Sequence, residues 1–220
     1  MDAATGRLDA RTLVEGALCI ALAAVLNVIG LQAPFGGKIS LGMLPIIVYA
    51  LRRGAVPGAI AGALFGLVDM QIEPYFVHPV QIALDYVVAF GLLGYVSGLF
   101  STWWLTASRR NAAAGAVPAV AASAAGVGAR FVAHWVSGVV FFATLTGGGP
   151  LAKGQSAFGS LSNFQRAGLY SLLYNGAYLL PSAIGCAVLA AILLPALQRI
   201  APVGPGRGDV AGTAQGTAGT

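Results

Sequence analysis

The segment Val80–Phe100 (VQIALDYVVAFGLLGYVSGLF) decides the class of fold, because it is apolar over a length that can cross a lipid bilayer. Its one charged side chain is Asp85, and Tyr86 follows directly. An ionised group at membrane depth costs about 2.5–3.5 kcal/mol on insertion scales, so such a group persists where it faces a cavity, a partner or a substrate. Asp85 is therefore the first candidate functional residue.

The composition of the whole chain points to the same class of protein. Hydrophobic residues make up 57% of the 220 residues, charged residues only 9%, and there are 31 glycines. The mean hydropathy is +0.81. These values are typical of lipid-embedded helices rather than of a soluble core, so the chain is predicted to be an all-α integral membrane protein.

Counting about 20 apolar residues as one span divides the chain into a predicted bundle of six transmembrane helices. The predicted spans are residues 12–31, 40–53, 55–72, 79–101, 113–145 and 167–198. Residues 1–200 are thus predicted to form one membrane domain. Residues 201–220 consist mainly of Gly, Ala, Pro and Thr without apolar periodicity, which predicts a disordered cytoplasmic tail.

Arginines cluster at alternate ends of the predicted spans and predict their orientation. They precede the first span and follow the second, fourth and sixth: Arg7, Arg11, Arg52, Arg53, Arg109, Arg110, Arg199 and Arg207. Because Lys and Arg accumulate in cytoplasmic loops, both the N- and the C-terminus are predicted to be cytoplasmic. The net charge of +5 then reports orientation, and no nucleic-acid binding is predicted.

Polar and aromatic side chains of several spans fall at a similar depth on the outer side. They are Asp85, His134, Tyr170, Tyr174 and Asn175, interleaved with Phe65, Phe141 and Phe142. At about 1.5 Å per residue, Asp85 lies roughly 9 Å and His134 roughly 16 Å from the outer end of its helix. Together these residues predict an aromatic-walled pocket, open to the outside, for a small, flat, cationic molecule.

Each of these residues also has a purely structural explanation. His134 could be an interhelical hydrogen bonder, and Asp85 could form an internal salt bridge with Arg130. Aromatic residues near the outer ends could anchor the helices at the membrane interface. These are Tyr75, Trp135 and Tyr178.

The sequence contains no clear motif of an enzyme active site. The loop Thr146–Ser156 lacks the Gly-Lys-Ser/Thr ending of a phosphate-binding loop. Ser137 and His134 are three residues apart on one predicted helix, with no separate base helix, and the two histidines give no metal-ligand spacing. The chain is predicted not to be an enzyme and to use no cofactor or metal.

Four separated motifs resemble one transporter family. They are Leu51–Gly54 (LRRG), Tyr75–Tyr86 (YFVHPVQIALDY), Arg130–Phe142 (RFVAHWVSGVVFF) and Tyr170–Asn175 (YSLLYN). In this order they are similar to the thiamine-specific S components (ThiT) of energy-coupling factor (ECF) transporters. The resemblance implies the ECF S-component fold. It also implies that the chain is a subunit in the bacterial plasma membrane that captures thiamine from outside. It also implies partners, namely a transmembrane T subunit and two cytoplasmic ATPases of an ABC-type importer.

The resemblance also implies which residues bind the ligand. Asp85 would balance the thiazolium cation, His134 and Gly138 would border the ligand, and Tyr170 and Asn175 would hydrogen-bond its polar groups. The same motifs include Tyr75 and Tyr86. Where some family members place tryptophans, this chain has Gly36, Phe65 and Phe142. Phenylalanine keeps a cation–π contribution of about 0.5–2 kcal/mol, whereas Gly36 removes that part of the wall.

Ala17 and Ala21 on the first predicted helix resemble the alanine motif with which the family docks against its T subunit. Two small residues four apart allow another helix to approach closely. Packing within the subunit is the alternative.

The predicted function is therefore the thiamine-binding S subunit of an ECF importer. An S component for another vitamin or for a thiamine precursor is the first alternative, and a membrane scaffold without a small ligand is the second. A stand-alone secondary transporter is disfavoured, because the chain shows neither inverted-repeat halves nor broken-helix signals.

Overall fold

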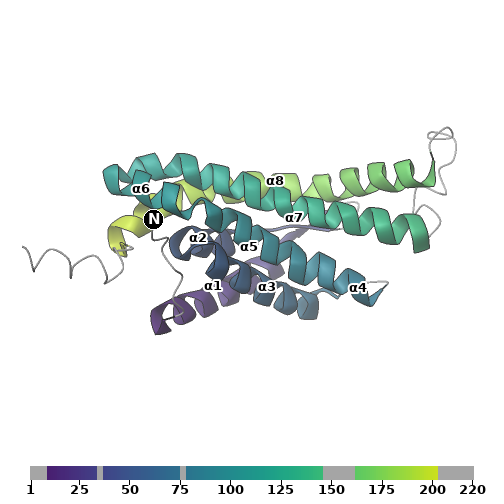
Figure 1. Cartoon of the computed structure of the whole chain (residues 1–220), viewed down its shortest axis with the longest axis horizontal. Coiled ribbons are helices and arrows are strands. Elements are labelled where there is room, and N and C mark those ends of the chain that lie inside the picture. Colours follow the sequence, from purple (N-terminus) through teal and green to yellow (C-terminus); the bar gives the residue numbers. More distant parts are fainter. Residues whose placement is uncertain (1–8, 34–36, 75–77, 146–161, 203–220) are drawn as a thin grey trace, which may run out of the picture.

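The computed structural model describes residues 9–33, 37–74, 78–145 and 162–202, and this part of the chain is almost entirely helical (Figure 1). The helices are α1 (Ala10–Val28), α2 (Met43–Arg53), α3 (Ala55–Ile72), α4 (Pro79–Ile82), α5 (Ala89–Leu99), α6 (Ser101–Arg110), α7 (Ala116–Leu145) and α8 (Asn163–Ile200). A π-helical segment, η1 (Ala83–Val88), joins α4 to α5, and a 3₁₀ turn, η2 (Ala112–Gly115), precedes α7. Strands β1 (Leu31–Gln32) and β2 (Lys38–Ile39) pair as an antiparallel hairpin between α1 and α2.

Five helical segments of the described chain are long and apolar enough to cross a membrane. They are Ala10–Val28, Ala55–Ile72, Pro79–Leu99, Ala112–Phe141 and Phe164–Ile200. Their outward faces carry large apolar side chains, for example Leu18 at 66% and Ile192 at 62% exposure, as expected of surfaces that lipid covers. These five segments confirm the prediction of an all-helical membrane protein.

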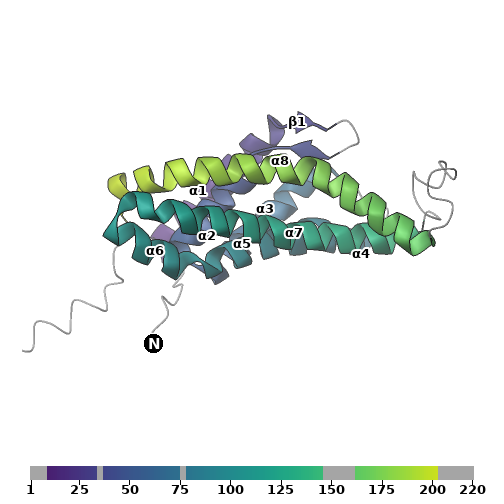
Figure 2. The same cartoon turned by 90° about the horizontal axis from the view of Figure 1, so that it is seen from above.

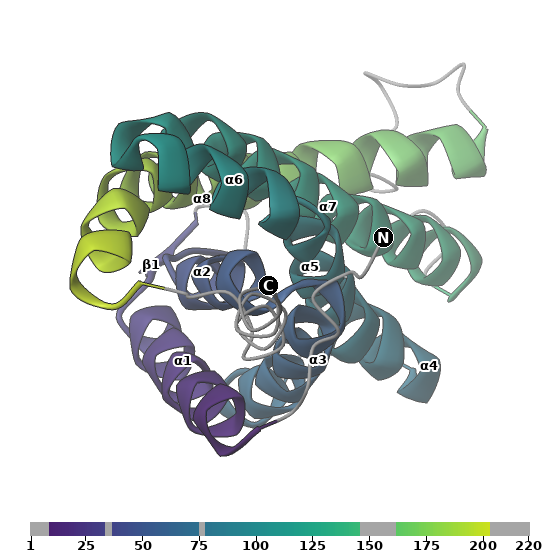
Figure 3. The ribbon, with the colours of Figure 1, turned by 60° about the vertical axis from the view of Figure 1, so that its left-hand side comes forward.

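The second predicted span differs from the other five. α2 has only 11 residues, which is about 16 Å of helix against a hydrocarbon core of about 30 Å. Every residue from Met43 to Arg52 is buried, and Figure 3 shows α2 enclosed by α1, α3, α5 and α8. α2 is therefore an interior helix, whose apolar side chains face protein rather than lipid.

The segment after the fourth predicted span is helical, although it lies between two predicted spans. α6 begins directly after the turn at Phe100 and packs Trp104 and Ser108 inward, while Trp103 is 49% exposed. This amphipathic pattern holds α6 against the end of the bundle where α5 finishes (Figure 1).

Glycines allow α3 to approach α5 closely. A Cβ atom at Gly62 would overlap the carbonyl oxygen of Phe90, and one at Gly94 would overlap the carbonyl oxygen of Gly58. The glycines spaced four apart on α3 therefore form a packing surface inside the protein. This close packing fixes the helix that carries Asp85 against α3.

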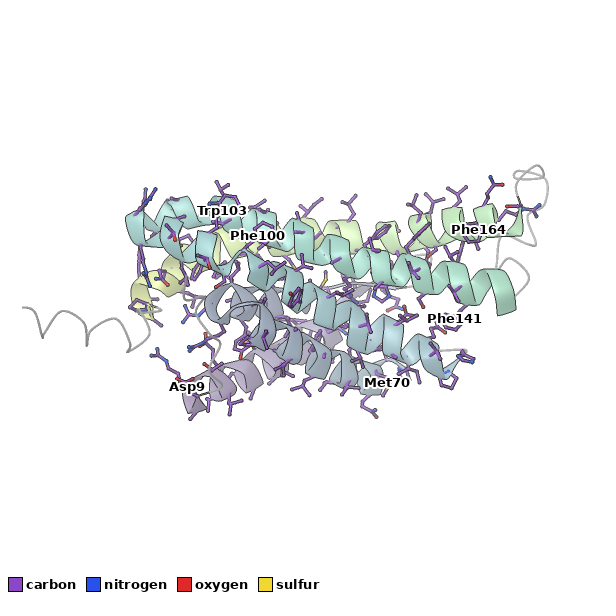
Figure 4. All side chains as sticks on the ribbon, in the orientation of Figure 1. Asp9, Met70, Phe100, Trp103, Phe141 and Phe164 are labelled. Carbon is purple, nitrogen blue, oxygen red and sulfur yellow. The ribbon has the colours of Figure 1, made fainter. Side chains whose placement is uncertain are left out.

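An ionic cluster joins three helices at the end of the bundle where α1 begins. Glu15 accepts hydrogen bonds from Nε of Arg52 at 2.6 Å and from Nε of Arg53 at 2.7 Å. Arg52 also donates to the carbonyl oxygen of Ala201 at 3.1 Å, which ties the end of α8 to α2. Figure 4 labels Asp9, Phe100 and Trp103 toward this end and Phe141 and Phe164 toward the opposite end.

Candidate ligand-binding site

A cavity of about 640 Å³ lies in the half of the bundle away from the Glu15 cluster, between α3, η1, α7, α8 and the β1–β2 hairpin. Its volume is that of a typical small-molecule site. The hairpin lies beside α8 (Figure 2). Gly37 has a positive φ of 75°, and a Cβ atom there would overlap the ring of Tyr178, so this glycine lets the hairpin pack onto the cavity wall.

The structure brings most of the predicted site residues together in this cavity. Its lining includes Asp85, Tyr86, His134, Gly138, Tyr170 and Asn175. Tyr75 and Gly36 lie outside the described residues, as does the side chain of Phe142.

Phe65 lies in the core rather than in the cavity wall. Its side chain is 1% exposed and packs edge-on against Phe90, with ring centroids 4.7 Å apart. Phe65 is on the side of α3 that faces α5, so it supports the helix behind the site. The expectation that Phe65 stacks on a ligand is therefore corrected.

The π-helical segment positions Asp85 and Tyr86 in the cavity wall. From Ala83 to Val88 the helix widens to i→i+5 hydrogen bonding, a local geometry found often at functional sites. Neighbouring residues of an α-helix point about 100° apart, and the wider turn reduces this divergence. The hydroxyl of Tyr86 donates to the carbonyl oxygen of Glu73 at 2.7 Å, which connects η1 to the end of α3.

His134 connects Asp85 to Arg130. Nε of Arg130 donates to Nε2 of His134 at 3.1 Å, so this ring nitrogen carries no proton. The hydrogen of the neutral imidazole is then on Nδ1, which donates to Oδ1 of Asp85 at 3.0 Å. The Asp85 side chain is 16% exposed, and the cavity reaches it. In place of the Asp85–Arg130 salt bridge that was the structural alternative, the two side chains are joined by hydrogen bonds through His134.

Three tyrosines of α8 supply the aromatic wall. Tyr170 and Tyr174 stack with ring centroids 5.7 Å apart, and Tyr174 meets Tyr178 edge-on at 5.8 Å. All three line the cavity, and Tyr178 is only 7% exposed. Tyr178 is therefore a cavity residue and not the membrane-interface anchor considered above. The spacing of four residues on one helix face was the signal that could have identified it.

Asn175 is held in one orientation by its neighbours on α8. Its Nδ2 donates to the carbonyl oxygen of Ser171 at 2.9 Å, and its Oδ1 accepts from the hydroxyl of Tyr178 at 2.7 Å. Ser171 in turn lies against Gly138, where a Cβ atom would overlap the Ser171 hydroxyl. Gly138 thus lets α7 and α8 approach each other beside the cavity.

Three charged residues of the cavity were not predicted from the sequence. Asp69, which is 9% exposed, accepts a hydrogen bond from the amide of Asn27, and Lys38 pairs with Glu73. Asp69 is the only charged residue of α3, so it carries the same signal as Asp85 in an apolar run. Lys38 and Glu73 lie in predicted connections, where the sequence alone does not distinguish them from ordinary surface charges.

The sequence profile of the thiamine transporter protein family (Thia_YuaJ) matches residues 13–202 of this chain. The chain therefore belongs to the thiamine transporter protein family. The thiamine transporter ThiT of Bacillus subtilis is 35% identical over an aligned region of 198 residues, and the match covers 86% of this chain and 92% of that protein. The thiamine transporter ThiT of Lacticaseibacillus paracasei is 28% identical over 195 residues, covering 87% and 86% of the two chains.

Solved structures give the same assignment to the thiamine transporter family. The structure of ThiT from Listeria monocytogenes superposes with a TM-score of 0.65 at 30% identity, over 87% of this chain and 95% of that one. The fold of this chain is therefore that of a ThiT protein. Members of this family are named as transporters, so the role of the protein is transport rather than catalysis.

Proposed function

We propose that this protein is the substrate-binding S subunit of an ECF-type ABC importer, which captures thiamine from outside the cell. It has six membrane-embedded helices, α2 included, and lies in a bacterial plasma membrane. The observation that carries the proposal is a carboxylate, Asp85, in a cavity walled by tyrosines. This chemistry suits a flat aromatic cation.

The residues of the cavity have distinct roles in the proposed complex. Asp85 balances the thiazolium charge with the part of its carboxylate that does not contact His134. Arg130 holds His134 in the tautomer whose Nδ1 donates to Asp85. The tyrosines of α8 stack on the rings of the ligand. Tyr170 and Asn175 hydrogen-bond its polar groups, with Gly138 making room beside them.

The arginine distribution supports an outward-facing cavity. Arg52, Arg53 and Arg199 lie in the last turns of α2 and α8, at the end of the bundle opposite the cavity. With these residues on the cytoplasmic side, both termini are cytoplasmic and the cavity opens to the exterior.

Titration calorimetry on the full chain tests the ligand. The protein is purified in detergent without thiamine and titrated with thiamine, pyrithiamine and riboflavin. We expect saturable one-to-one binding of thiamine and none of riboflavin. Absence of heat and of competition by pyrithiamine, on protein shown to be folded, would contradict thiamine as the substrate and leave the family fold intact. Riboflavin binding would instead support an S component for another vitamin.

Ala17 and Ala21 are proposed to form the docking face for a T subunit, which works with two cytoplasmic ATPases. Both alanines are exposed on α1. They lie beside exposed apolar side chains such as Leu18. A flat, small-residue stripe on an apolar surface suits close helix packing in a membrane.

Ala17→Trp tests this docking face. We expect the variant to bind thiamine normally and to lose co-purification with co-expressed T and ATPase subunits. Ala124→Trp, at an exposed alanine of α7, is the matched control and should retain both properties. Loss of thiamine binding in Ala17→Trp would mean that Ala17 packs within the subunit instead.

A further inference from the structure

The charges of the cavity do not cancel. Among the described residues that line it, the carboxylates are Asp69, Glu73 and Asp85, and the cations are Lys38 and Arg130. Three carboxylates thus face two cations beside a neutral His134. Which carboxylate remains without a cation decides where a positively charged ligand binds.

Glu73 and Lys38 neutralise each other. Nζ of Lys38 forms an ion pair with Oε1 of Glu73, between the hairpin and the end of α3. The Glu73 side chain is 44% exposed, so this pair lies toward the mouth of the cavity. It leaves Arg130 with two carboxylates, Asp69 and Asp85.

Arg130 does not form a direct ion pair with Asp85. Its Nε is used by His134, and its guanidinium carbon lies 3.9 Å from the centroid of the Phe90 ring. The imidazole of His134 lies between Arg130 and Asp85, because its two ring nitrogens bond one to each.

Asp69 is fixed where it can balance this cation. It is 9% exposed near the end of α3, and the side-chain amide of Asn27 from α1 donates to its Oδ1. A carboxylate this deeply buried requires compensating charge. Asp69 and Arg130 line the same cavity, and Arg130 is the lining cation that remains once Lys38 has paired with Glu73.

We propose that Asp69 determines the specificity of the cavity for a cation: its carboxylate neutralises Arg130 and thereby leaves Asp85 as the uncompensated charge. The inference rests on the proposed function and assigns a role to a residue that acts through Arg130 rather than on the ligand. Without Asp69, Arg130 and Asp85 would balance each other and the cavity would become neutral.

Asp69→Asn tests this role, because the amide keeps the shape and can still accept the hydrogen bond from Asn27. Two probes are titrated, thiamine and deazathiamine, a neutral analogue with a thiophene ring in place of the thiazolium. We expect the thiamine dissociation constant to rise about tenfold, equivalent to about 1.4 kcal/mol, with that of deazathiamine changing less than about twofold. A residue that only packs α1 on α3 would weaken both probes equally, and an unchanged ratio overturns the proposal.

Arg130→Gln provides a second test with the opposite sign. Removing the cation leaves two uncompensated carboxylates, so the preference for thiamine over deazathiamine should increase. A decrease, or no change, in this ratio overturns the proposal even if Asp69→Asn does not fold. Failure of the wild-type protein to bind either probe would contradict the proposed function itself, which is a different outcome from normal binding with an unshifted ratio.

Discussion

The two ends of the bundle each hold a cluster of charged side chains, and the clusters are built differently. At the end where α1 begins, the single carboxylate of Glu15 receives hydrogen bonds from both Arg52 and Arg53. At the cavity end, the carboxylate of Asp85 receives one from the neutral ring of His134. Both oxygens of the Glu15 carboxylate accept hydrogen bonds from protein side chains, whereas the Asp85 carboxylate can still accept a contact from a ligand.

This difference distinguishes charged side chains that hold helices together from charged side chains that bind a ligand. A buried ionic group whose partners all belong to the protein stabilises a particular arrangement of helices, and breaking its pair leaves an uncompensated charge. A partly satisfied group beside a cavity contributes little to stability but strongly favours a ligand of opposite charge. Variants at the two ends should therefore affect different measurements.

The largest expected effect is loss of stability in Glu15→Gln. Arg52 is 7% exposed and would lose its ionic partner, which costs about 3 kcal/mol, near the lower end of the range for buried pairs. Unfolding in mixed detergent and SDS micelles measures the loss. The thiamine dissociation constant of the folded protein should not change.

Glu73→Gln is the matched control for Glu15→Gln, since it also removes one carboxylate from an ion pair. The Glu73 side chain is 44% exposed, so its loss should reduce stability by about 0–1 kcal/mol. Equal destabilisation by the two variants would show that burial is not what distinguishes the clusters. Weaker thiamine binding in Glu15→Gln would show that the two ends are coupled.

The second effect is the loss of affinity in Asp85→Asn. The amide keeps the shape and can still accept from Nδ1 of His134, so folding should change little. Losing a charge-assisted contact to the thiazolium should cost about 2 kcal/mol, or roughly 30-fold in the thiamine dissociation constant. Calorimetry measures the affinity, and the micelle unfolding midpoint serves as the control. Unchanged affinity would contradict the counter-ion role.

The sequence predicted the cavity residues better than it predicted the helices around them. Asp85, His134 and Asn175 are polar groups in apolar runs, a signal that does not depend on knowing the neighbours. Before its two terminal arginines α2 is a largely apolar run, and hydropathy does not show whether such a run faces lipid or surrounding protein. The π-helical turn at η1 likewise has no local sequence signature, because packing determines where a helix widens.

Phe65 shows why helix faces were difficult to assign. α3 is apolar on nearly every side, so no polar stripe indicates which side faces the cavity. Only the close glycine contacts with α5 settle that Phe65 points into the core. The position of Tyr178 was ambiguous for a similar reason, since a tyrosine suits both an aromatic belt at the membrane interface and a cavity wall.

A smaller effect is expected from Gly138→Ala, which tests the close approach of α7 and α8 at the cavity end. The added Cβ would overlap the hydroxyl of Ser171, so the helices must separate, at a cost of about 1–2 kcal/mol of stability. Thiamine affinity should fall as well, because Ser171 orients Asn175. Gly128→Ala on the same helix has open space around the new Cβ and should stabilise the protein by up to about 1 kcal/mol. Similar results for both variants would exclude the packing role of Gly138.

The smallest effect is expected from Tyr178→Phe, which separates the aromatic wall from its hydrogen bonds. The variant keeps the edge-on contact with Tyr174 but removes the hydroxyl that donates to Oδ1 of Asn175. This hydrogen bond orients Asn175, which is proposed to contact the ligand. If its full contribution of about 1 kcal/mol is lost from the complex, thiamine affinity should fall roughly fivefold. Tyr178→Leu also removes the ring and should weaken binding further. If both variants bind thiamine equally well, the ring of Tyr178 does not contribute to the wall, and stacking on the ligand is left to Tyr170 and Tyr174.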